Sequence, residues 1–402
     1  MDVRLARRAR EQPASPIRRL APLAAEARRH GRHVFQLNIG QPDIPAPREI
    51  LERLKAFDQP NVAYGPCEGL PEFLTAVQDY YAGLGLDYRR EELFATTGGS
   101  EALLFTLAAI ADHGDDVLVF EPFYTNYSGF AAMVGVHTRP VTTHAEDGYH
   151  LPSMDTIEAR IGPKTRAILL CSPNNPTGTV YTDEELECIG ELCRRYGLYL
   201  VADEVYREFI YDGARHRSAA TLEGLEQQII LTDSLSKRVS LCGARVGWIA
   251  SKNAAFMDAV LRFGQARLCP PTLGQYIGAV FNQIGADYMN SVVAEYEKRR
   301  DLVFAAFDAM PGVLVKRPEG AFYLCAKLPI DDTQKFAEFM LRDFAIDNET
   351  VMVAPADGFY ATAGAGRDEV RIAYVLNTAE LTRAMDIIRA ALEAYPGTAS
   401  AG

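Results

Sequence analysis

The sequence lacks the features that mark disulfide-stapled, zinc-binding and membrane-spanning proteins. Its seven cysteines are scattered, odd in number and free of any C-x-x-C pair, which argues against a disulfide framework and against a zinc site. No stretch approaches the roughly 18 uncharged apolar residues of a membrane span. The arginine-rich start has no apolar core of a secretory signal. We therefore expect no metal, no membrane partner and a reducing, cytoplasmic location.

Positive charge is also scarce. The 53 acidic residues outnumber the 41 lysines and arginines, which gives a net charge of −12. Nucleic acids attract basic faces, so this balance disfavours them as the main partner and fits a small-molecule substrate better. The 402 residues exceed the size of one compact core, so we expect two packed units.

The middle of the chain alternates short β-rich runs with helical patterns, which is typical of a mostly parallel sheet covered by helices. The runs cover residues 93–96, 117–120, 167–171, 198–201, 229–232 and 246–250. A capping box from Thr182 to Glu185 predicts a helix that continues to Tyr196 and stops at Gly197. Asp203 then lies just beyond the carboxyl end of a buried strand, where open α/β sheets bind ligands.

The pattern changes after residue 286 and predicts a second, smaller α+β domain. A long charged helix is expected from Asp287 to Met310, and further helices near residues 333–344 and 378–394. Short strands are expected near residues 313–315, 322–325 and 370–373. We predict a large domain of residues 46–286 and a small domain formed by residues 1–45 and 287–402, with a cleft between them.

The stretch that ends at Lys237 carries the clearest chemical signal. A lysine amine forms Schiff bases with carbonyl cofactors, and pyridoxal phosphate also needs a phosphate clamp and an acid against its pyridine nitrogen. Ser234 and Ser236 flank the lysine, and Arg245 follows eight residues later, suited to bidentate phosphate contacts. Lys237 alone would be an ordinary loop residue, so the prediction depends on the other motifs.

Residues 96–105 supply a second candidate for the phosphate site. Two glycines after a predicted strand let the backbone approach a ligand, and the free N–H groups at the start of the next helix suit an anion. We assign Gly99, Ser100 and Glu101 to this loop. A simple turn with a helix cap is the alternative.

Three further motifs are candidates for the cofactor ring. Asn175, in a proline-bracketed loop, can donate to a phenolate oxygen, although asparagine and proline also make plain turns. Asp203 can keep a pyridine nitrogen protonated, with a helix cap as the alternative role and Glu204 as the competing carboxylate. Tyr124 is the candidate for stacking on the ring, and Phe123 is the alternative.

In combination these motifs resemble the class I/II aminotransferases of the aspartate aminotransferase superfamily. The resemblance runs from about residue 15 to residue 394 and is carried by residues 38–43, 97–100, 172–178, 203–206, 234–237, 243–247 and 370–373. It implies a pyridoxal 5′-phosphate-dependent enzyme with a three-layer α/β large domain. It also implies a homodimer whose active sites lie at the subunit interface.

The resemblance implies further site residues and a reaction. Tyr64 looks like the tyrosine that reaches the phosphate of the neighbouring subunit's cofactor, and Gly40 like the backbone contact near the substrate. Tyr206 matches a second hydroxyl on the cofactor phenolate, and Arg371 matches the arginine that binds the substrate carboxylate together with Asn175. The reaction implied moves an amino group between an α-amino acid and a 2-oxo acid, with Lys237 and Asp203 as the catalytic residues.

Two points stay open. Another pyridoxal-phosphate reaction, such as β-elimination or decarboxylation, would use the same cofactor residues; a non-enzymatic regulator would need a DNA-binding domain, for which the chain has no room before Ser15. Some aspartate-acting relatives carry a lysine where this chain has Ser100, so we expect a neutral amino acid to serve at least comparably to aspartate. Arg18 and Arg267 are candidates for a replacement cation, or ordinary surface charges.

Overall fold

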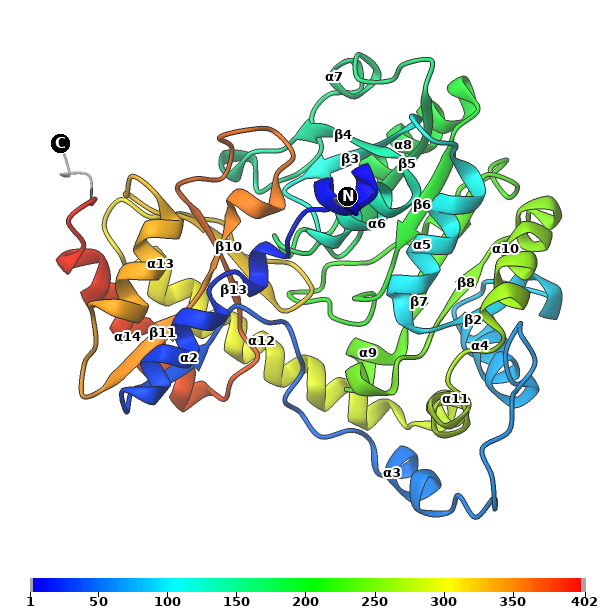
Figure 1. Ribbon diagram of the computed structural model, residues 1–402, viewed down its shortest axis with the longest axis horizontal. Coiled ribbons are helices and arrows are strands. Elements are labelled where there is room, and N and C mark those ends of the chain that lie inside the picture. The colour runs from blue at the N-terminus through cyan, green and yellow to red at the C-terminus, as the bar shows by residue number, and fades with distance from the viewer. Residues whose placement is uncertain (1–2, 399–402) are drawn as a thin grey trace.

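A computed structural model describes residues 3–398, and a seven-stranded sheet lies at the centre of its larger part (Figure 1). In spatial order its strands are β2 (Leu93–Thr96), β8 (Gly247–Ala250), β7 (Ile229–Ser234), β6 (Tyr199–Asp203), β5 (Thr165–Cys171), β3 (Asp116–Glu121) and β4 (His137–Thr142). β8 runs antiparallel to its neighbours β2 and β7. The other neighbouring strands are parallel, so the sheet is mixed and mostly parallel, as predicted.

Helices cover both faces of this sheet because its strands are apolar on both sides. Successive side chains of β5, such as Ile168 and Leu169, point to opposite faces and join two separate hydrophobic cores. The helices on one face are α5 (Gly98–Ile110), α6 (Asn126–Val134) and α10 (Ala254–Arg267), and those on the other are α4 (Pro71–Gly83) and α8 (Asp183–Tyr196). This three-layer arrangement confirms the predicted α/β class.

Helix α8 begins and ends as its sequence predicts. The Thr182 hydroxyl accepts from the Glu185 N–H at 3.2 Å, and the Glu185 carboxylate accepts from the Thr182 N–H at 2.7 Å. Gly197 closes the helix in the left-handed conformation, with φ of 63°. The next strand, β6, therefore starts at a defined point and delivers Asp203 to the carboxyl edge of the sheet.

A smaller part of the molecule is built from two further sheets. Its four-stranded antiparallel sheet has the order β12 (Ala354–Pro355), β13 (Glu369–Ala373), β10 (Tyr323–Lys327) and β9 (Leu314–Val315). A second sheet pairs β1 (His33–Gln36) in parallel with β11 (Glu349–Met352). The helices α2 (Ala21–Arg29), α12 (Ala286–Asp308), α13 (Thr333–Arg342) and α14 (Thr378–Ala394) surround these strands, and α12 extends toward the larger part of the molecule (Figure 1).

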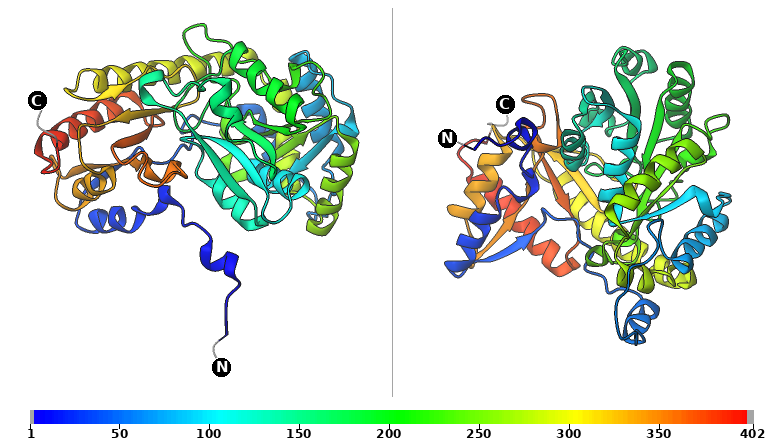
Figure 2. Two further views of the ribbon diagram at one scale, coloured as in Figure 1. Left: turned by 90° about the horizontal axis from the view of Figure 1, so that it is seen from above. Right: turned by 45° about the vertical axis from the view of Figure 1, so that its right-hand side comes forward.

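The remaining helices are short. They are α1 (Arg7–Glu11), α3 (Arg48–Lys55), α7 (Met154–Glu158), α9 (Leu235–Arg238) and α11 (Thr272–Gly278). The chain before α2 leaves the small sheets and projects from the body of the molecule (Figure 2), where the Gln12 amide donates to the Gly129 carbonyl at 3.1 Å. Within residues 3–398, no helix combines the length and the apolar content needed to span a membrane.

The sequence patterns did not predict four of the strands. β4 lies at the edge of the large sheet and contains Pro140, which removes a backbone donor and weakens the strand pattern. β1 and β11 are four residues each, and β12 is two residues long. Such short segments form because a partner strand is present, so their own side chains carry little signal.

Candidate active site

A cavity of about 260 Å³ opens at the carboxyl ends of β5, β6 and β7, beside the start of α5 and the small antiparallel sheet. It brings together thirteen of the residues that the sequence singled out. These are Arg18, Gly40, Gly99, Ser100, Tyr124, Asn175, Asp203, Tyr206, Ser234, Ser236, Lys237, Arg245 and Arg371. Tyr64 and Glu101 are not among the residues that line it.

Lys237 lies on the four-residue helix α9, directly after β7. The Ser234 hydroxyl caps this helix by accepting from the Ser236 N–H at 3.3 Å. The Lys237 amine donates to the Gly40 carbonyl at 2.7 Å and lies 5.8 Å from the centre of the Phe322 ring. Lys237 therefore places a primary amine in the cavity, at the boundary between the large and the small sheets.

Asp203 is a buried carboxylate without an ion-pair partner in the described chain. Its Oδ2 accepts from the Tyr127 hydroxyl at 2.8 Å, and its Oδ1 accepts from the Val205 N–H at 3.4 Å. Burial raises the pKa of Asp203 to about 6. A carboxylate in this setting lacks a cation, and a protonated ring nitrogen in the cavity would supply one.

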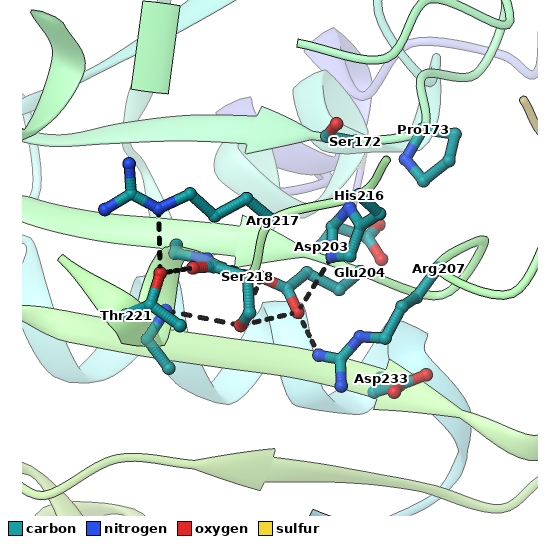
Figure 3. A network of polar contacts seen from close by, with 12 residues as sticks. Ser172, Pro173, Asp203, Glu204, Arg207, His216, Arg217, Ser218, Thr221 and Asp233 are labelled. Carbon is teal, nitrogen blue, oxygen red and sulfur yellow. Dashed lines mark hydrogen bonds and ion pairs between the residues drawn. The ribbon is translucent and has the colours of Figure 1, made fainter. Parts of the chain in front are cut away.

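The Glu204 side chain points away from the cavity that Asp203 lines. Figure 3 shows its carboxylate in a network with Arg207, His216 and Ser218. Burial opposes ionisation of Glu204, but Arg207, His216 and the Ala219 N–H outweigh it and hold the pKa of this carboxyl at about 2. Of the two competing carboxylates, Asp203 lines the cavity and Glu204 does not.

The start of α5 and Arg245 form one end of the cavity. Gly98 has φ of +71°, and a Cβ atom there would come within 2.6 Å of the Arg245 guanidinium. Arg245 donates to the Cys242 carbonyl at 2.9 Å, and Ser100 and Ser234 line the same cavity. Helix-start N–H groups, hydroxyls and a guanidinium together suit a phosphate group.

Glu101 and Arg267 are engaged with each other beside this end of the cavity. Their side chains form an ion pair at 2.8 Å. Glu101 also accepts from the Thr97 N–H at 2.8 Å, and Arg267 donates to the Cys67 carbonyl at 3.1 Å. Glu101 therefore supports the start of α5 from outside the cavity lining, and Arg267, which pairs with it, does not line the cavity either.

Arg371 is a buried cation that faces the cavity from strand β13. Only 1% of its surface is exposed, so Arg371 is not an ordinary surface arginine. One Nη donates to the Asn175 side-chain oxygen at 3.0 Å, and the other donates to the Asn38 carbonyl. No carboxylate of the described residues pairs with it. A substrate carboxylate would supply the missing counter-charge.

The stacking candidates separate in the same way. Tyr124 lines the cavity, whereas Phe123 is buried in the core beside Tyr127. The Tyr124 hydroxyl accepts from the Asn126 amide at 2.7 Å, and burial raises its pKa to about 12. Tyr323 lines the cavity too, although no sequence motif pointed to it. Its place in a predicted strand was the only signal, and a strand pattern does not identify a cavity residue.

Comparisons with known proteins agree with this geometry. The profile of the family described as Aminotransferase class I and II matches residues 32–388. A probable aspartate/prephenate aminotransferase of Aquifex aeolicus is 29% identical over 97% of this chain and 98% of its own length. Aromatic-amino-acid aminotransferase 2 of Thermococcus litoralis is 31% identical over 92% of this chain and 94% of its own. The structure of Thermus thermophilus aspartate aminotransferase with maleate has a TM-score of 0.86 at 28% identity, covering 97% of this chain and 100% of that one.

The opposite states of Asp203 and Glu204 predict opposite effects on stability. The folded protein without cofactor holds the Asp203 proton more tightly than the unfolded chain does, so the stability linked to that proton is lost as the pH rises through about 6. We expect Asp203→Asn to raise the free energy of unfolding of the cofactor-free protein at pH 8 by about 1–3 kcal/mol. The gain should shrink as the pH falls from 6 to 4, measured by urea unfolding.

Glu204→Gln is the matched control for this experiment. The pKa of Glu204 is lowered to about 2, so its contribution is present above the unfolded pKa and is lost on acidification. Glu204→Gln should therefore destabilise the protein at pH 8, since it leaves Arg207 buried without its anion. A loss of stability at pH 8 in Asp203→Asn would contradict the assignment of an unpaired carboxylate.

Proposed function

The chain belongs to the class I and II aminotransferases, a family that uses pyridoxal phosphate, and we propose that Lys237 is the residue that binds this cofactor covalently. The protein is a transaminase, which moves an amino group from an amino acid to an oxo acid. The family match favours this transfer over β-elimination and decarboxylation, which the motifs alone left open. The observation that carries the proposal is the meeting of Lys237 with the unpaired Asp203 in one cavity.

The residues of the cavity fit the cofactor at both ends. Gly99, Ser100, Ser234, Ser236 and Arg245 would hold its phosphate, and Asp203 would hold the protonated ring nitrogen. Tyr124 would stack on the ring, and Asn175 and Tyr206 would donate to its phenolate oxygen. When bound, pyridoxal phosphate supplies a carbonyl that links to amines and a ring that accepts electrons from the substrate carbon.

The chain's own residues would then bind the substrate and move its proton. Arg371 and Asn175 would hold the α-carboxylate, because the guanidinium is buried and lacks a carboxylate partner. The Lys237 amine would take the proton from the substrate Cα and return it to the acceptor carbon. No other lysine lines the cavity in the part of the chain that the structure describes.

Arg18 is proposed as the partner of a second, distal carboxylate on some substrates. It lines the cavity, whereas Arg267 is held by Glu101. The Asn38 side chain donates to the Ile17 carbonyl at 3.1 Å, and the Asn38 backbone carbonyl accepts from Arg371. Asn38 therefore connects the segment that carries Arg18 to the proposed carboxylate-binding arginine. The relatives named above act on aspartate and prephenate or on aromatic amino acids, and one was solved with maleate.

We also propose that two copies of the chain form a cytoplasmic homodimer. Tyr64 is 82% exposed and does not reach the cavity of its own chain, as expected for a residue that serves the partner's cofactor phosphate. Other exposed apolar side chains occur on α3 and around α11; they include Leu51, Leu54, Val62, Leu268 and Leu273. The proposed division into residues 46–286 and residues 1–45 with 287–402 puts the cavity between the two domains.

Cofactor attachment can be tested by chemical trapping. Borohydride reduction of the holoenzyme should fix a pyridoxyl group on Lys237, since an imine is the bond that borohydride reduces. Peptide mass mapping locates the label. Lys237→Ala should carry no label and lose transamination, while Lys252→Ala, which changes a half-buried lysine outside the cavity, should behave as the parent. A label on another lysine would overturn the assignment.

The role of Arg18 predicts a change of substrate preference. Arg18→Ala should lower kcat/KM for aspartate ~10- to 100-fold, the worth of one charge-assisted contact, and leave alanine within about twofold. Arg19→Ala is the matched control, because the neighbouring arginine pairs with Asp357 and does not line the cavity. Equal losses for both substrates would contradict the proposal. The parent's own ratio for aspartate and alanine tests the expectation that a neutral donor serves comparably, which stays a prediction.

The shared site predicts complementation between two variants. Tyr64→Phe removes one phosphate hydrogen bond and should weaken cofactor affinity about five- to tenfold. In a hybrid dimer with Lys237→Ala, the one site that keeps Lys237 also receives an intact Tyr64 from the other subunit, so cofactor titration should show the parent affinity restored. Weak affinity that persists in the hybrid would place Tyr64 in the site of its own chain.

A further inference from the structure

Tyr323 occupies an unusual position at the junction of the two parts of the molecule. It is the first residue of β10, it is 2% exposed, and it lines the cavity. Its ring and hydroxyl fill space that Gly40 leaves free, since a Cβ atom on Gly40 would overlap the Tyr323 hydroxyl. The glycine whose carbonyl accepts from Lys237 is therefore also the residue that admits Tyr323.

Tyr323 closes a ring of contacts with three cavity residues. Its hydroxyl lies 2.9 Å from the Tyr206 hydroxyl, and its ring packs 4.7 Å from the Arg371 guanidinium. Arg371 donates to the Asn175 side-chain oxygen at 3.0 Å, and the Asn175 amide nitrogen donates to the Tyr206 hydroxyl at 3.5 Å. Two members come from strands of the small sheet and two from loops that follow strands of the large sheet.

The donors and acceptors of this ring leave one bond whose direction is open, the one between the Tyr206 and Tyr323 hydroxyls. The guanidinium of Arg371 can only donate, so Asn175 must turn its oxygen to Arg371 and its amide nitrogen to Tyr206. A tyrosine hydroxyl has one proton and two acceptor positions. If Tyr206 accepts from Asn175 and from Tyr323, both acceptor positions are used, and its own proton is left for a third partner.

Tyr206 keeps that proton at neutral pH. Burial raises the pKa of its hydroxyl well above the usual value, and the neighbouring Tyr323 raises it further. The cavity is where a third partner can lie, because the Tyr206 side chain lines it. In the proposed function that partner is the phenolate oxygen of the cofactor, an acceptor without a proton.

We propose that Tyr323 is a positioning residue that donates its hydroxyl proton to Tyr206, and thereby directs the Tyr206 proton into the cavity. Its ring packs against the Arg371 guanidinium, and the centre of the Phe359 ring lies 4.8 Å from the same guanidinium as a second aromatic contact. Tyr323 thus joins the residue that faces the cofactor oxygen to the residue that binds the substrate carboxylate. This inference rests on the proposed binding of the cofactor at Lys237.

The test is a pH titration of the holoenzyme's visible absorption band. A donor to a negatively charged oxygen stabilises the deprotonated form of the cofactor, so a misdirected donor raises the pH midpoint. Tyr323→Phe should raise the midpoint by about 0.4–1 pH unit, the worth of one hydrogen bond. The variant keeps the ring over Arg371, so KM should stay within about twofold. It loses the hydroxyl that directs the Tyr206 proton, so kcat should fall about three- to tenfold.

A double variant separates positioning from a general structural effect. Tyr206→Phe should raise the midpoint by more than Tyr323→Phe, and the combined variant should match Tyr206→Phe alone, because Tyr323 acts through that hydroxyl. Tyr374→Phe is the control: its buried hydroxyl donates to the Ala321 carbonyl, which keeps Tyr211 as a second donor, so the midpoint should not move. Additive shifts in the double variant, or an unchanged midpoint in Tyr323→Phe, would overturn the inference. A parent protein without the absorption band would instead overturn the proposed function on which it rests.

Discussion

Burial of charge is the constraint that organises the site. Asp203 and Glu204 are consecutive and both buried, yet one has its pKa raised to about 6 and the other has it lowered to about 2. The difference lies in their partners: Glu204 has Arg207 and several donors, whereas Asp203 has a tyrosine hydroxyl and one N–H. An unpaired buried charge destabilises the folded protein. A ligand of opposite charge that binds at the end of this central strand would remove that cost, and its binding would be strengthened accordingly.

Arginines without a carboxylate partner among the described residues lie at both ends of the cavity. Arg371 is buried, and the half-buried Arg245 donates hydrogen bonds to the backbone carbonyls of Cys242 and Thr97. In charge, one end of the cavity therefore suits an anion such as phosphate, the centre suits a cation, and the far end suits a carboxylate. Close packing around them depends on two glycines, because side chains at Gly98 and Gly40 would run into Arg245 and Tyr323. The shape of the cavity therefore depends on the missing side chains at Gly98 and Gly40 as well as on the charged groups.

The sequence predicted the parts of this site that lie at strand ends, and it could not predict the pairings. The six runs from residue 93 to residue 250 became strands within about two residues at their ends, and Thr182 began its helix as predicted, because burial and capping are local signals. The pairing of Glu101 with Arg267 depends on how helix α10 packs, because Arg267 lies 166 residues further along the chain. Tyr323 was hidden for the same reason, since its partners Tyr206 and Arg371 meet it only in the folded protein.

The residues that follow Lys237 and Asp203 in the sequence explain why these two side chains point into the cavity. Lys237 is followed by Arg238, just as Asp203 is followed by Glu204, and neither follower lines the cavity. Arg238 is buried against Asp233 at 2.5 Å and Glu208 at 3.1 Å, so its direction is fixed by ion pairs. Removing one partner of such a pair costs about 3–5 kcal/mol, far more than turning a single side chain. The buried ion pairs of Arg238 and Glu204 therefore fix the backbone next to Lys237 and Asp203. With the backbone fixed in this way, the side chains of Lys237 and Asp203 point into the cavity.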